Sequence, residues 1–231
     1  MLPSQETRTS VSAQAPSHRP LSRRLARIPR WLRRRVRPSR ARAQGNPRDL
    51  QRGRLLSLLP SEAVCAEIGS WKGDFAAEIL SDRSPRTLYL VDPWEHRQEQ
   101  EYERAWYGGT ASGQDQLDAV HDSVLARFAG EIGSGQVVVL RRRSLDAAGA
   151  FADASLDWVY IDGDHRYEGV KADLEAYYPK VKPGGWLAGD DYGYKSGWFE
   201  DGVTRAVDEF APGRGELKII GTQFLLHKRV S

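Results

Sequence analysis

Short apolar segments alternate with amphipathic segments along most of this chain. From about residue 51 onward, runs of four to six mostly apolar residues alternate with segments that contain glycine, proline or aspartate, a pattern typical of strands buried in a sheet. The last two runs are close enough to pair as an antiparallel hairpin. We predict strands at 63–68, 87–91, 136–140, 156–161 and 185–189, followed by hairpin strands at 217–220 and 223–226.

The segments between these runs carry apolar residues at helical spacing. In each of four segments an apolar residue recurs every three or four positions, so these side chains share one face of a helix. The four faces are Phe75, Ile79 and Leu80; Leu117, Val120, Val124 and Phe128; Val170, Leu174, Tyr178 and Val181; and Val203, Ala206, Val207 and Phe210. Proline and glycine at 183–185 and 212–213 are expected to end the last two helices.

Repeated strand-helix units predict the fold class. Alternation of this kind is typical of an α/β protein with a doubly wound, mostly parallel sheet that helices cover on both faces. We therefore expect a seven-stranded, Rossmann-like sheet whose last two strands form the antiparallel C-terminal hairpin. In such sheets ligands bind beyond the carboxyl ends of the strands. Residues at those ends are the first candidates for a functional site.

Aspartates stand at two of these strand ends. Asp162 and Asp164 follow the fourth predicted strand, and Asp190 and Asp191 follow the fifth. Clustered carboxylates repel one another and lose solvation, so four of them at neighbouring strand ends predict a bound hard cation or a proton-transfer site. Oxygen ligands favour Mg²⁺ over zinc. Each pair taken alone also fits a helix cap or a turn.

A turn that contains glycines follows the first predicted strand. Gly69 and Gly73 permit a tight turn and a close approach of a ligand to the backbone, and Asp92, after the second strand, can accept hydrogen bonds from both hydroxyls of a ribose. This pattern fits NAD as well as S-adenosylmethionine. The G-x-G-x-x-G spacing that a pyrophosphate needs is absent, which favours a nucleoside ligand without a pyrophosphate. A tight turn without a ligand is the structural alternative.

Charge is divided unevenly along the 231 residues. Residues 1–54 hold 15 arginines and two acidic residues, a formal charge of +13, whereas the remainder holds 19 basic and 29 acidic residues, a charge of −10. We therefore divide the chain into a basic leader at 1–50 and a globular domain at 51–231. Cys65 is the single cysteine, and no apolar run is long enough for a membrane span or a signal peptide. We expect a cytoplasmic protein.

The leader has a basic amphipathic pattern at residues 21–38, where apolar residues recur every three or four positions among arginines. Such a segment can contact an anionic membrane surface, bind a nucleic-acid backbone, act as a transit peptide or remain a solvated tail. The acidic remainder of the chain argues against an extended nucleic-acid footprint on the domain. Peripheral membrane contact through the leader stays open.

Four motifs, taken in their order along the chain, carry a family resemblance. They are Glu67 to Gly73 (EIGSWKG), Val91 to Trp94 (VDPW), Ile161 to Glu168 (IDGDHRYE), and Pro183 to Tyr192, which contains PGG and DDY. Together they resemble class I S-adenosylmethionine-dependent methyltransferases and, within that class, metal-dependent sugar O-methyltransferases related to macrocin O-methyltransferase. The resemblance covers residues 51–230, which makes the globular domain a methyltransferase domain by this interpretation.

The resemblance implies S-adenosylmethionine and Mg²⁺ as cofactors and a role for each motif residue. The expected cofactor-binding residues are Gly69, Ser70 and Gly73 at the methionine part, with Glu67 nearby, Asp92 at the ribose and Ser144 near the adenine. The expected metal ligands are Asp162, Asp190 and Asp191. Asp164 is the expected general base, and His165 is a second candidate for that role.

The implied reaction is Mg²⁺-dependent methyl transfer to a sugar hydroxyl of a glycoside, an antibiotic or a glycan precursor. A catechol-like phenol is an alternative acceptor, and a nucleic-acid-binding protein that uses the leader is an alternative of another class. Aromatic residues and glycines at 94–113 predict a lid over a small-molecule or glycan acceptor, with Tyr192, Tyr194 and Trp198 as the opposite wall. A homo-oligomer is left open.

Overall fold

The computed structural model of the chain describes residues 46–195 and 197–230. The amphipathic segment predicted at 21–38 lies outside these ranges. The described residues form one seven-stranded sheet in the order β3-β2-β1-β4-β5-β7-β6. The strands are β1 (Val64–Ile68), β2 (Thr87–Asp92), β3 (Val137–Arg141), β4 (Leu156–Ile161), β5 (Val181–Gly189), β6 (Gly215–Ile220) and β7 (Gln223–Lys228).

The strand directions confirm the predicted fold class. β1 pairs in parallel with β2 and β4, β2 pairs in parallel with β3, and β4 with β5, whereas β7 runs antiparallel to both β5 and β6. The sheet is therefore mostly parallel, and β6 and β7 form the predicted hairpin. The strand order reverses between β1 and β4, and such a reversal opens a crevice at the carboxyl ends of the strands.

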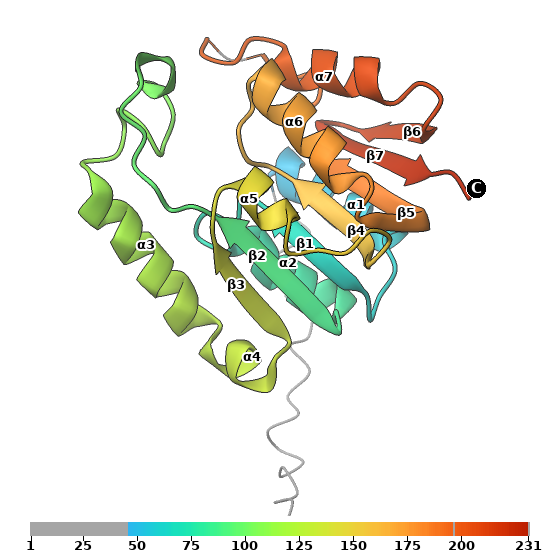
Figure 1. Cartoon of the computed structure of the whole chain (residues 1–231), viewed down its shortest axis with the longest axis horizontal. Helices are drawn as coiled ribbons and strands as arrows, with labels where there is room; N and C mark the ends of the chain where they lie inside the picture. The colour runs from blue at the N-terminus through green and yellow to red at the C-terminus, as the bar shows by residue number, and fades with distance from the viewer. Residues whose placement is uncertain (1–45, 196, 231) are drawn as a thin grey trace, which may run out of the picture. The chain divides into compact units, whose positions relative to one another are not determined.

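Helices cover both faces of the sheet (Figure 1). Helices α5, α6 and α7 pack on one face, and α1, α2 and α3 pack on the other. No helix in the described part of the chain is both long and apolar enough to cross a membrane. The helices are α1 (Pro47–Leu58), α2 (Asp74–Arg83), the 3₁₀ helix η3 (Gln100–Tyr102), α3 (Gln114–Arg127), α4 (Ala129–Ser134), α5 (Ser144–Ala148), α6 (Tyr167–Tyr177) and α7 (Gly202–Phe210).

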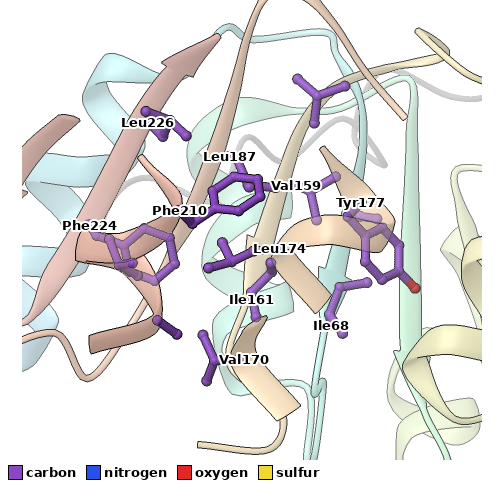
Figure 2. Close-up of a cluster of buried hydrophobic side chains, with 14 of the residues drawn as sticks. Ile68, Val159, Ile161, Val170, Leu174, Tyr177, Leu187, Phe210, Phe224 and Leu226 are labelled. Atoms are coloured by element: carbon purple, nitrogen blue, oxygen red, sulfur yellow. The ribbon is translucent and has the colours of Figure 1, made fainter. Parts of the chain in front are cut away.

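Strand β4 lies at the centre of the fold and is buried on both faces. Side chains alternate along a strand, so Val159 and Ile161 join the layer beneath α6 and α7, which Figure 2 shows, while Trp158 and Tyr160 join the layer beneath α1 and α2. Leu174 of α6 belongs to the first of these layers. Burial on both faces explains why the sequence of β4 is an almost continuous apolar run.

The strand register brings predicted site residues to one level. Ile161, the last residue of β4, pairs with the last residues of β1 and of β5. Gly69, Asp162 and Asp190 follow these three strand ends directly. They therefore leave the sheet side by side, at the crevice where the strand order reverses.

The connection from α6 to β5 differs from the prediction. The helix expected to continue through Val181 ends at Tyr177, and β5 begins at Val181 instead of at Gly185. Val181 pairs with Leu156 of β4, and Gly184 has a φ of 75°, so Pro183 and its neighbours form an irregular stretch inside the strand. Helical spacing placed Val181 on a helix face, but its partner in β4 makes it a strand residue.

Helix α1 begins within the segment that was assigned to the leader. The side chain of Asn46 accepts a hydrogen bond from the backbone N–H of Asp49 at 3.0 Å, and Pro47 occupies the first turn. Both features are typical of a helix start. Leu55 and Leu56 of α1 are buried against the sheet. The helix is thereby anchored to the domain, with its first turns close to the carboxyl ends of the strands.

The core layer between α6 and the sheet predicts a large stability effect. Leu174→Ala should lower the free energy of unfolding by about 2–5 kcal/mol, because Leu174 is buried and its loss leaves a cavity. Leu58→Ala, at an exposed position of α1, is the matched control and should change it by at most about 0.5 kcal/mol. Urea unfolding of both variants measures the difference, and equal losses would contradict the assignment of Leu174 to the core.

Candidate active site

A cleft of about 730 Å³ lies at the carboxyl ends of the parallel strands. It is lined by the loops that follow β1, β2, β3 and β4, together with part of α1 and α6. Most of the predicted site residues line it: Glu67, Gly69, Ser70, Asp92, Ser144, Asp162, Asp164 and His165. Gly73, Asp190 and Asp191 lie in the adjoining turns and not in the lining itself. The topology thus brings distant sequence motifs to one cavity.

The glycine turn after β1 depends on close backbone contact. Gly69 has a φ of 87°, and a Cβ placed on it would lie 2.2 Å from the carbonyl oxygen of Asp162. Any other residue would force the loops after β1 and β4 apart. Gly73 has a φ of 73° and precedes α2, so the second glycine also permits a conformation that other residues rarely adopt.

Glu67 is a buried carboxyl group with an unmet hydrogen-bonding capacity. Its side chain lines the cleft, the residue is 2% exposed, and its Oε2 has no hydrogen-bond partner among the described residues. Burial, reinforced by the charge of Asp162, raises the pKa of Glu67 well above its usual value. A buried acceptor without a donor is costly. A ligand that brings a cationic donor would satisfy it.

Asp92 organises two backbone turns at the end of β2. Its Oδ2 accepts a hydrogen bond from the N–H of Trp71 at 2.9 Å, and its Oδ1 accepts one from the N–H of Trp94 at 2.7 Å. Burial raises the pKa of Asp92, although these two hydrogen bonds oppose the shift. Each oxygen keeps a further lone pair. The carboxylate can therefore also accept from ligand hydroxyls in the cleft.

Asp173 is a site residue that the sequence interpretation missed. It belongs to α6, lines the cleft and is 2% exposed, and its carboxyl group is hydrogen-bonded to the side chain of Ser144. The hydroxyl of Tyr177 donates to the carbonyl oxygen of Ser144 at 2.8 Å. Two residues of α6 thus hold Ser144 in place. The sequence did contain one indication of a buried polar site, because Asp173 lies between Val170 and Leu174 on the apolar face of the predicted helix.

Three groups converge beside the cleft in the arrangement of a metal site. His165 Nε2 lies 3.3 Å from Asp162 Oδ1, and its Nδ1 lies 3.1 Å from Asp191 Oδ2. One ligand atom from each of these three residues falls within 4.8 Å of the others. Burial alone would lower the pKa of His165, but the hydrogen bond to Asp162 and the charge of Asp191 raise it above its usual value.

Asp190 faces protein donors instead of this cluster. Its side chain is 0% exposed. Its Oδ1 accepts from the backbone N–H of Asp191 at 2.8 Å and from Thr222 Oγ1 at 2.9 Å. Its Oδ2 accepts from Arg48 Nε at 2.7 Å and from Arg52 Nε at 3.1 Å. Burial would raise the pKa of Asp190, but the two guanidinium charges lower it overall.

Arg48 and Arg52 are functional candidates that the sequence interpretation did not single out. They are separated by four positions in α1 and therefore project from the same side of the helix. Both line the cleft. Their spacing was visible in the sequence, but their partners lie more than a hundred residues away along the chain.

Asp164 is held by the lid segment and by its own loop. Arg166 Nη2 lies 2.7 Å from Asp164 Oδ2, and the hydroxyl of Tyr102 donates to the same oxygen at 3.0 Å. Burial and the charge of Asp164 raise the pKa of Tyr102 to about 12, so this hydroxyl stays a neutral donor near pH 7. The structure therefore separates the two candidate bases. Asp164 contacts the lid, whereas His165 contacts the carboxylates.

Aromatic residues border the mouth of the cleft. Tyr102, Trp106 and Tyr107 of the predicted lid line it. Trp94 does not, because it is fully buried and its Nε1 donates to the carbonyl oxygen of Trp71 at 2.9 Å. Of the predicted opposite wall, the ring of Trp198 lies 5.9 Å from that of His165 and 6.3 Å from that of Tyr107. The hydroxyl of Tyr192 instead donates to Asp208.

The buried carboxyl of Asp173 predicts a pH-dependent stability. Burial raises its pKa to about 7, so between pH about 4 and 7 the folded protein binds a proton that the unfolded chain has lost. The contribution of Asp173 to the free energy of unfolding should therefore fall as the pH rises through this range. Asp173→Asn removes this titration. Urea unfolding should show that the variant becomes more stable relative to the unsubstituted protein as the pH rises from about 4 to about 7. A difference in the free energy of unfolding that stays constant over this range would contradict the raised pKa.

Comparisons with known proteins bear on the family and the fold of this chain. A family model described as a methyltransferase domain matches residues 66–192, more than half of the chain. A comparison with curated proteins gives no match. A solved structure of a Corynebacterium glutamicum protein is 22% identical with a TM-score of 0.52, and the match covers 83% of this chain and 89% of that one.

Two further solved structures have the same fold. The O-methyltransferase NovP is 21% identical with a TM-score of 0.55, and 80% of this chain and 78% of that one are covered. An rRNA methylase from Streptococcus thermophilus is 15% identical with a TM-score of 0.50, over 80% of this chain and 98% of that one. At these identities the likenesses show the fold alone. The family model decides the assignment, and the chain belongs to the methyltransferase-domain family as an S-adenosylmethionine-dependent methyltransferase.

Proposed function

We propose that this methyltransferase transfers the methyl group of S-adenosylmethionine to a sugar hydroxyl in a Mg²⁺-dependent reaction. The observation that carries the proposal is the convergence of Asp162, His165 and Asp191 beside the cleft that also contains Glu67 and Asp92. A neutral sugar hydroxyl is a poor nucleophile, so its methylation requires a group that stabilises negative charge on the oxygen and a group that accepts the proton. The cleft offers candidates for both.

Two features of the cleft support cofactor binding by the predicted residues. The buried Oε2 of Glu67 lacks a donor, which the ammonium group of the methionine part would supply. The carboxylate of Asp92 retains lone pairs for the ribose hydroxyls after its two backbone hydrogen bonds. When bound, the cofactor supplies a methyl group attached to a sulfonium, and the sulfur leaves as a neutral thioether. The residues of the cleft bind it and orient this methyl group toward the acceptor oxygen.

The donor set beside the cleft supports a divalent cation. Asp162 and Asp191 each offer a carboxylate oxygen, which Mg²⁺ prefers, and His165 offers a ring nitrogen. When bound there, Mg²⁺ would lower the pKa of a coordinated hydroxyl and stabilise the charge that develops on it. Asp190, the third predicted ligand, would have to exchange its two arginine partners before it could join the set.

Removal of the acceptor proton falls to Asp164 or His165. The Asp164 carboxylate lies at the cleft, where Tyr102 and Arg166 orient it. The His165 ring lies between two carboxylates, and it can accept the proton only if it is not itself a ligand of the cation. A base in either position contributes about 10²- to 10⁴-fold to the rate.

The aromatic border of the cleft supports a ring-shaped acceptor. Trp106 and Tyr107 line the cleft, and the Trp106 side chain is exposed, whereas the ring of Tyr102 is buried against the guanidinium groups of Arg97 and Arg166. Aromatic faces pack against the apolar faces of sugar rings and exclude water from them. Tyr102 also connects this border to Asp164 through its hydroxyl. A sugar held here would present its hydroxyls toward the carboxylates.

The metal assignment predicts a loss of activity when either Asp162 or Asp191 is replaced, since both were predicted as ligands and both belong to the three-residue group. Asp162→Asn and Asp191→Asn should each lower kcat/KM for methyl transfer by about 10²-fold or more at saturating Mg²⁺, because a neutral amide binds a hard cation weakly. Asp115→Asn, an exposed aspartate of α3, is the matched control and should keep full activity. Labelled S-adenosylmethionine and a glycoside acceptor provide the assay. Full activity in the presence of a chelator would show that the reaction needs no metal.

The two candidate bases can be separated by their pH–rate profiles. The variant that lacks the base, Asp164→Asn or His165→Ala, should have a kcat lower by about 10²- to 10⁴-fold and should lose the acidic limb of the profile. The other variant should keep that limb. Calorimetric binding of S-adenosylhomocysteine serves as the control for folding and should be retained by both variants. Unchanged profiles in both would remove proton abstraction from these two residues.

A further inference from the structure

Two arginines of α1 occupy the surroundings of the predicted metal ligands. Arg52 Nη2 lies 2.7 Å from Asp162 Oδ2 and 2.9 Å from Asp190 Oδ2. Arg48 Nε lies 2.7 Å from Asp190 Oδ2, and its Nη2 lies 3.5 Å from Asp191 Oδ1. A single guanidinium group therefore bridges two carboxylates that are expected to share an ion. Both arginines lie outside the segment that matches the family model, residues 66–192.

These contacts leave the three aspartates Asp162, Asp190 and Asp191, here called the aspartate cluster, with little net negative charge. The three aspartates, Asp162, Asp190 and Asp191, contribute three negative charges, and Arg48 and Arg52 contribute two positive charges. The side chains of Asp190 and Arg52 are only 0% and 15% exposed, so solvent screens these charges weakly. A divalent cation that enters the cluster is attracted by the carboxylates and repelled by both guanidinium groups.

The two arginines differ in their freedom to move. The side chain of Arg48 is 47% exposed and can turn into solvent by a change of rotamer. The guanidinium of Arg52 lies 4.8 Å from the centre of the Phe75 ring and is enclosed. Its neighbour Gln51 accepts a hydrogen bond from the N–H of Thr222 at 3.1 Å, which ties α1 to the turn between β6 and β7. Arg52 is therefore held more firmly than Arg48.

We propose that Arg52 competes with the divalent cation for Asp162 and Asp190 and thereby sets the Mg²⁺ affinity of the site, while Arg48 leaves the cluster when the ion binds. This inference rests on the proposed function, because it requires a metal site at Asp162 and Asp191. It makes α1 part of the active site. In the absence of the ion, the arginines neutralise carboxylates that would otherwise repel one another in a poorly solvated place.

The test is the Mg²⁺ affinity of the full chain, measured by isothermal titration calorimetry without cofactor or acceptor. Arg52→Met removes the charge and keeps a long apolar stem, so its Kd for Mg²⁺ should fall by about 5- to 150-fold. Arg52→Lys keeps the charge and should bind Mg²⁺ about as the unsubstituted protein does. Arg54→Met is the matched control, since Arg54 is exposed on the same helix and makes no ion pair with any described residue. Its Kd should not change.

Thermal unfolding provides a readout that a purely structural role would not reproduce. Without Mg²⁺, Arg52→Met should have a lower Tm, because Asp162 and Asp190 lose their shared counter-charge. Added Mg²⁺ should then raise the Tm of this variant more than that of the unsubstituted protein, because tighter binding stabilises the folded state more. A structural role alone would lower the Tm and leave the Kd unchanged.

Equal or weaker Mg²⁺ binding by Arg52→Met would overturn the inference and leave the proposed function standing. If neither the unsubstituted protein nor any variant binds Mg²⁺, the metal is removed from the proposed function, and the inference falls with it. Should Arg52→Met fail to fold, Arg48→Met makes the same comparison at a more exposed position. We expect tighter Mg²⁺ binding by that variant too, by a smaller factor, and unchanged or weaker binding would overturn the inference.

Discussion

The backbone contact between the loops that follow β1 and β4 is the constraint on which the site depends. Gly69 approaches the carbonyl oxygen of Asp162 so closely that a Cβ has no room. This contact joins the loop that carries the cofactor-binding candidates to the loop that carries the carboxylates. Because the two strands are parallel and end in register, the loops that follow them begin side by side. The glycine at this position thus allows the two loops to line the same cleft, although they carry different kinds of functional residue.

Charge compensation shapes the other half of the site. Asp190 is fully buried and Asp162 is only partly exposed, so solvent stabilises the two carboxylates weakly, and their counter-charges come from a helix that precedes the first strand. Asp164 has a separate partner in Arg166. The acidic motifs therefore do not act as one undivided cluster. Each carboxylate has at least one cationic partner, and Arg48 and Arg52 are shared between several carboxylates. These partners decide which oxygen atoms remain available to an ion, a proton or an acceptor.

The secondary structure could be predicted where local pattern and tertiary environment agree. The apolar runs matched β1 to β4 closely, and the reason is plainest for β1 and β4, because strands buried on both faces need apolar residues at nearly every position. The prediction went wrong at Val181, where helical spacing continued past the end of α6 but pairing with β4 governed the backbone. Asp173 was missed for a related reason. Its position on the inward face of a helix gave no indication that it would meet Ser144 in the cleft.

By itself, the sequence determined the fold class and most of the strand-end residues that line the cleft, since apolar periodicity and the placement of glycine and aspartate are local properties. Only the tertiary structure decided the partners of those residues. It directed Asp190 toward Arg48 and Arg52, and it placed His165 between Asp162 and Asp191. Hydrogen bonds and ion pairs between residues far apart in the sequence depend on how helices and strands pack, and no local pattern encodes that geometry.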